Sequence, residues 1–126
     1  MKNGICFVAF VVFVVAVAGC AIIPGTQSSF SDTKNTTPRV YVSNLEGAHA
    51  AKCVIKNIDE RLAFLTASLT PEAPRPNVLE VRARSEVGFA AIIEIAPADK
   101  GSLITTWISN HYPAKGTITN GITEGC

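Results

Sequence analysis

The fold is decided by residues 78–109, which read VLEVRARSEVGFAAIIEIAPADKGSLITTWIS. Three apolar-rich segments, 78–85, 89–96 and 103–109, are separated by two short turns that contain glycine. In the first segment apolar and charged residues alternate, which is typical of a strand with one buried face. The second segment is apolar on both faces apart from Glu94, which predicts a central strand. The stretch therefore predicts an antiparallel meander.

Upstream of this sheet, the spacing of apolar residues predicts a helix over residues 44–60. Ser43 and Glu46 have the spacing of a capping box, in which each side chain binds the backbone N–H of the other residue. Apolar residues then recur every three or four positions, as on one face of a helix, at Ala48, Ala51, Ile55 and Ile58.

Weaker patterns complete the fold. Residues 39–42 alternate and predict a short edge strand. Residues 62–69 are ambiguous between a helix extension and a strand, and we favour the strand because alternate positions are apolar. The tail 114–126 predicts only a short helix, since its glycines disfavour helix. We expect an α+β fold: an antiparallel three- to four-stranded meander covered on one face by the N-terminal helix and the short C-terminal helix.

The first 20 residues have the order of a secretory signal: a basic start, an apolar run over 4–18 and small residues before Cys20. The motif Val17-Ala18-Gly19-Cys20 resembles the lipobox of bacterial lipoproteins. That resemblance implies removal of the signal peptide 1–19 by signal peptidase II and acylation of Cys20. The alternative is an uncleaved transmembrane helix, but a span needs roughly 20 apolar residues and this run is shorter.

Cleavage would leave a lipidated Cys20 and a Ser/Thr-rich flexible tether over 20–38, followed by a single domain over 39–126. Without Lys2, ten basic and ten acidic residues remain. This balance argues against nucleic acid, which needs a basic surface, so the expected partners are the membrane, through acyl chains on Cys20, and another envelope protein. In the sorting of enterobacterial lipoproteins, Ala21 after the acylated cysteine implies the outer membrane, facing the periplasm.

Two cysteines remain for a disulfide once Cys6 is removed and Cys20 is acylated. The predicted helix places Cys53 on its flank, and Cys126 ends the chain, so we expect the disulfide Cys53–Cys126 in an oxidising compartment. The mature part also resembles small proteobacterial envelope lipoproteins of unknown function, which carry one cysteine in an early helix and another at the C-terminus. No Cys-x-x-Cys pair is present, and we expect neither a metal nor a cofactor.

Few residues have the pattern of a chemical site. His49 and His111 are the only histidines, and no Gly-x-Ser-x-Gly motif accompanies them. Glu94 is either an acid–base group or a structural carboxylate, which lies at a sheet edge or pairs with a cross-strand partner such as Arg82 or Arg84. Aromatic residues gather near the end of the last strand and form either a protein-binding patch or part of the core; the candidate binding residues are Trp107, His111 and Tyr112.

These observations favour a non-catalytic, lipid-anchored envelope protein that binds another envelope component. One alternative is a small periplasmic enzyme that uses His49 or His111. Another is an envelope inhibitor or phage-exclusion factor that masks an envelope protein. A concave pocket lined by a histidine and an acid would favour the enzyme.

Overall fold

The structure is a computed structural model that describes residues 29–126. The predicted signal peptide 1–19, the lipidation site Cys20 and the first part of the predicted tether lie outside the described residues. From Ser29 onward, three helices and five strands follow one another along the chain.

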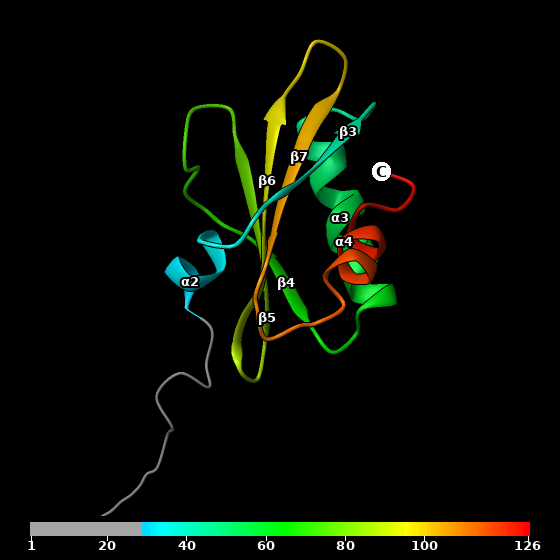
Figure 1. The fold of residues 1–126 in the computed structure, drawn as a ribbon. Helices are drawn as coiled ribbons and strands as arrows, with labels where there is room; N and C mark the ends of the chain where they lie inside the picture. The colour runs from blue at the N-terminus through cyan, green and yellow to red at the C-terminus, as the bar shows by residue number, and fades with distance from the viewer. Residues whose placement is uncertain (1–28) are drawn as a thin grey trace, which may run out of the picture.

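A five-stranded antiparallel sheet forms the centre of the domain (Figure 1). Its strands in chain order are β3 (Arg39–Ser43), β4 (Thr66–Leu69), β5 (Leu79–Ser85), β6 (Gly88–Pro97) and β7 (Ser102–Ile108). The spatial order is β3-β7-β6-β5-β4, so the last four strands form a meander and β3 pairs with β7 at the edge. The predicted α+β antiparallel fold is confirmed. The sheet has five strands and not the three or four that we predicted, because both weakly patterned segments, 39–43 and 66–69, pair with it.

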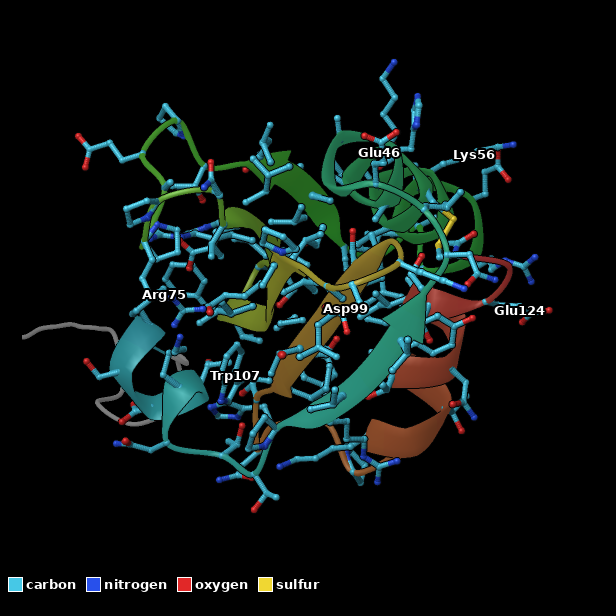
Figure 2. All side chains as sticks on the ribbon, turned by 90° about the horizontal axis from the view of Figure 1, so that it is seen from above. Glu46, Lys56, Arg75, Asp99, Trp107 and Glu124 are labelled. Carbon is cyan, nitrogen blue, oxygen red and sulfur yellow. A yellow bond between two sulfur atoms is a disulfide. The ribbon has the colours of Figure 1, made fainter. Side chains whose placement is uncertain are left out.

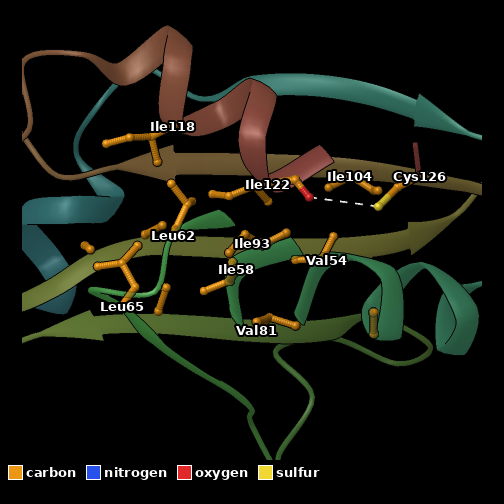
Figure 3. Packing of buried hydrophobic residues seen from close by; sticks show 14 of the residues in the cluster. Val54, Ile58, Leu62, Leu65, Val81, Ile93, Ile104, Ile118, Ile122 and Cys126 are labelled. Carbon is orange, nitrogen blue, oxygen red and sulfur yellow. Dashed lines mark hydrogen bonds between the residues drawn. The ribbon is translucent and has the colours of Figure 1, made fainter. Parts of the chain in front are cut away.

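Two helices cover one face of the sheet, which we name the core face. They are α3 (Gly47–Arg61) and α4 (Lys115–Thr123), and they also contact each other. Isoleucine and valine side chains from both helices and from the central strands interlock there (Figure 3). Fully buried examples are Val54, Ile58, Ile93, Ile104 and Ile122. The two helices therefore cover one face, as the sequence predicted.

The opposite face, which we name the second face, carries a helix that the sequence did not predict. Helix α2 (Phe30–Lys34) lies within the expected flexible tether over 20–38 and contacts β6 and β7. Its start is capped by Ser29, whose hydroxyl accepts a hydrogen bond from the Asp32 N–H at 3.0 Å. Thr33 is fully buried. The tether prediction is thus wrong for the part that includes α2, because side chains of that segment dock on the sheet.

The predicted capping box is also wrong. Helix α3 begins at Gly47, and its N-cap Glu46 makes no side-chain hydrogen bond. Ser43 is the last residue of β3, and its hydroxyl instead accepts from the Leu45 N–H and donates to the Cys126 carbonyl at 2.5 Å. The contact with the C-terminus thus replaces the local cap.

The buried side of α3 only partly follows the predicted stripe. Ala51 and Ile58 are buried, whereas Ala48 is exposed and Ile55 only half-buried. Ala50, Val54 and Asn57 complete the buried side. After the helix, Leu62 and Leu65 turn into the core, and the strand predicted for 62–69 is confined to β4, Thr66–Leu69.

Candidate functional site

The predicted disulfide is confirmed. Cys53 on α3 bonds to Cys126, with the two Cα atoms 5.8 Å apart. The buried Asn57, one turn further along α3, donates to the carbonyls of Ile122 and Glu124 at 2.9 and 2.8 Å. A covalent bond and an amide clamp therefore hold the last residues against α3. The clamp was not foreseen, because an asparagine on a helix gives no sequence signal of its distant partners.

The predicted aromatic patch is not one surface. Trp107 lies half-buried on the second face, with the Lys34 ammonium 3.9 Å from its ring centroid. Tyr112 instead packs against the core cluster and donates to the Ser85 hydroxyl at 2.7 Å. His111 is exposed. Trp107, His111 and Tyr112 are neighbours in sequence, but the sheet separates Trp107 from Tyr112.

Both His49 and His111 are exposed. Neither residue lines the groove at the β6–β7 end of the sheet, which is described below, or the hollow beside the β5–β6 turn. Within residues 29–126, no group of three or more histidine, cysteine, aspartate and glutamate side chains is placed to hold a metal ion.

A cluster of charges lies on the second face, near α2. The Glu94 carboxylate is only 5% exposed and accepts from Lys34 Nζ at 2.6 Å and Arg75 at 3.1 Å. Neither Arg82 nor Arg84, the partners we predicted for Glu94, fills this role. Arg82 lies opposite Ile92 in the ladder and contacts Glu80 at 3.4 Å.

Aromatic rings surround this charge cluster. The Phe30 ring lies beneath the Arg82 guanidinium at 4.6 Å and packs edge-on against Phe89 at 5.7 Å. Arg84 lies 4.4 Å from the same Phe89 ring. Each cation thus has an aromatic or carboxylate neighbour, and the cluster fastens α2 to the sheet. We interpret it as structural.

A concave feature lies at the end of the sheet where β6 turns into β7. This end groove, of about 580 Å³, is formed by three segments: residues 46–48 at the start of α3, residues 77–79 before β5, and the β6–β7 turn. Glu46 and Asp99 carry the acidic groups on its lining. Figure 2 looks down on this end, with Glu46 and Asp99 on neighbouring loops.

Two backbone positions give the end groove a defined shape. Asn77 has a φ of 65°, the left-handed region that asparagine tolerates better than most residues. Gly101 has a φ of +87°, and a Cβ there would lie 2.1 Å from the Ser43 carbonyl oxygen. The loops therefore pack directly on the strand ends. Loops fixed on a rigid sheet are a common place for binding residues.

The lining of the end groove combines acidic and apolar side chains. The groove is open, and it has no histidine or nucleophile beside its acids. The sequence correctly predicted the turn at residues 97–101, but it gave no sign that this turn would lie beside the start of α3, since that depends on the whole topology.

No helix within residues 29–126 is long and apolar enough to cross a membrane. Comparison of the chain with protein families, with curated proteins and with solved structures finds no match in any of the three.

Proposed function

We propose that this chain is a non-catalytic, lipid-anchored protein of the cell envelope that binds another envelope component in the end groove. The lipobox-like motif Val17-Ala18-Gly19-Cys20 supports the anchor. Two or more acyl chains give stable membrane attachment where one does not. Ala21 after the cysteine supports the outer membrane as its location, with the domain in the periplasm.

The observation that carries the binding function is the position of the end groove. Phe30, near the start of the described chain, packs on Phe89 at the beginning of β6. The groove lies at the other end of the same ten-residue strand. A strand of that length spans about 30 Å. A partner in the groove would therefore bind about one strand length away from Phe30, where the described part of the chain begins.

The anchor is tested by Cys20→Ser, with Cys6→Ser as the matched control, since both cysteines lie in the N-terminal segment. We expect Cys20→Ser to abolish incorporation of a labelled fatty acid and to leave the signal uncleaved, whereas Cys6→Ser retains both. The wild-type protein should fractionate with outer-membrane markers. Labelling that persists in Cys20→Ser would refute the lipobox interpretation.

The groove is tested with a photoreactive amino acid at Ala98, which lines it, and at Val87, in the exposed turn at the other end of β6. Irradiation of intact cells should cross-link position 98, and not position 87, to an envelope protein that mass spectrometry identifies. Asp99→Lys should reduce that product, because it reverses an acidic charge at the groove. Equal labelling from both positions would contradict a specific groove.

A further inference from the structure

The edge strand β3 is unusually apolar. It reads Arg39-Val40-Tyr41-Val42-Ser43, and its two valines are 59% and 68% exposed. Edge strands offer unsatisfied backbone N–H and C=O groups to other chains, and proteins usually protect them with lysine, proline or a bulge. Within its five residues β3 contains neither lysine nor proline, and its register with β7 is regular.

The other edge of the sheet lacks this character. Strand β4 has four residues, and it presents Thr66 and Ser68 on the second face, opposite Arg84 and Arg82. Strand β3 presents Val40 and Val42 on that same face. Val42 lies opposite Leu103, itself 37% exposed. We name Val40, Val42 and Leu103 the β3 strip.

We propose that β3 pairs antiparallel with β3 of a second copy of this chain, centred on Tyr41, so that two five-stranded sheets join into one. In this register Tyr41 lies opposite its own equivalent, Val40 opposite the second copy's Val42, and Arg39 opposite the second copy's Ser43. The valines of the two copies thereby meet on the second face and cover each other.

The charges of β3 favour a second copy as the occupant. Like charges directly opposite each other in a ladder are destabilising. The only charged residue of β3 is Arg39, at its first position, and the proposed register pairs it with a serine. In the proposed register no charged residue of β3 lies opposite a like charge, so the charges of the strand permit it to pair with itself across a twofold axis.

The symmetry of this pairing also agrees with the position of α2. The twofold axis of an antiparallel strand pair in one continuous sheet is perpendicular to the sheet. Both copies then present their second faces, and with them both α2 helices, on the same side. This arrangement is compatible with two anchors in one membrane, but the pairing itself does not depend on lipidation.

The test uses the full chain in its native membranes, with a photoreactive amino acid at Val42 or, as a matched exposed valine, at Val87. Cells express two copies of the protein with different affinity tags. We expect irradiation to give a product that carries both tags from position 42 and none from position 87. Chemical cross-linking of the two tagged chains with a disuccinimidyl reagent should also give a product that carries both tags, and it requires no substitution in the chain.

A second variant tests the pairing of the two edge strands. With the probe at Tyr41, Val42→Lys should abolish the two-tag product. In the proposed register each new lysine lies opposite Val40 of the other copy, and the twofold axis produces this unfavourable pair twice. Val87→Lys should leave it unchanged, and both variants should retain the wild-type melting temperature. The proposal is overturned if position 42 labels only a different protein, if positions 42 and 87 give equal yields, or if Val42→Lys retains the product. Labelled fatty-acid incorporation, measured in parallel, reports separately on the anchor.

Discussion

Glu80 and Glu94 lie directly opposite each other in the β5–β6 ladder, and both carboxylates are buried on the second face. Such a like-charged pair is unfavourable unless other groups neutralise it. The two carboxylates are neutralised unequally. Glu94 has two close cationic partners, Lys34 and Arg75, from outside the strand pair. Glu80 has one contact, with Arg82 at 3.4 Å, and its second oxygen has no hydrogen-bond partner among the described residues.

This asymmetry predicts opposite responses to the same isosteric change. Glu94→Gln should lower the free energy of unfolding by about 1–3 kcal/mol, because it removes the charge that two cations share. Glu80→Gln should change it by less than about 1 kcal/mol or raise it, because it removes a poorly paired buried charge and the repulsion across the ladder. Urea denaturation of both variants measures the difference. Equal losses would mean that both carboxylates are equally well paired.

Lys34 should hold α2 on the sheet. Lys34→Met keeps the length of the side chain but loses the ion pair with Glu94 and the cation–π contact with Trp107. Because the lysine is partly exposed, we expect a loss of about 1–2 kcal/mol. Hydrogen exchange should accelerate at residues 30–36 and remain unchanged in α3.

The control for this variant is Lys100→Met, at an exposed lysine in the β6–β7 turn. It should leave both the stability and the exchange of α2 unchanged. Faster exchange throughout the domain in Lys34→Met would show instead that α2 is not a separately docked segment.

The sequence predicted the parts of this fold whose signals are local. The alternation in β5 and the apolar run of β6 define strands by themselves, and the turn at Pro97 and Gly101 contains the residues that turns require. The disulfide could also be predicted from the sequence, because only Cys53 and Cys126 remained to pair once Cys6 and Cys20 were assigned to the predicted signal peptide and lipid anchor. These features need only neighbouring residues, or a small number of alternatives, to be predicted.

The features that sequence analysis missed depend on distant contacts. Helix α2 has five residues, too few to be stable by itself, and it docks on β6 and β7, more than 50 residues further along the chain. Ser43 was predicted as a helix cap, but the C-terminal carbonyl 83 positions later is its partner. The end groove likewise depends on three loops that only the topology brings together.

The Cys53–Cys126 disulfide should contribute a large share of the stability. It closes a separation of 73 residues, for which the chain-entropy relation gives about 4 kcal/mol. The double variant Cys53→Ser with Cys126→Ser should lose roughly that amount in urea denaturation. In the unreduced, denatured wild-type protein these two cysteines should not react with a thiol reagent; labelling of both would contradict the bond.

Asn57 should stabilise the C-terminal segment independently of the disulfide. Asn57→Ala removes the hydrogen bonds to the carbonyls of Ile122 and Glu124 and to Cys126 Sγ, and should cost about 1–3 kcal/mol. Asn120→Ala, at an exposed position on α4, should cost little. The comparison should be repeated in the background that lacks the disulfide. A loss that disappears there would mean that Asn57 acts only when the terminus is already tied down.

Gly101 should be the least replaceable glycine of the end groove. Two effects oppose Gly101→Ala: its φ of +87° disfavours a side chain, and the new Cβ would lie 2.1 Å from the Ser43 carbonyl oxygen. Gly125→Ala is the matched control, because Gly125 also has a positive φ, +74°, but a Cβ there meets nothing within 4 Å.

The control thus isolates the close contact from the backbone strain. We expect Gly125→Ala to cost about 1 kcal/mol from the strain alone and Gly101→Ala roughly 2–4 kcal/mol, since the turn must move away from β3. That movement displaces Ala98 and Asp99, so the photo-cross-link from position 98 should weaken in Gly101→Ala even at temperatures where the domain remains folded. It should persist in Gly125→Ala. If Gly101→Ala lowers the stability without changing this cross-link, the shape of the groove does not matter for the partner, and the proposed binding site is wrong.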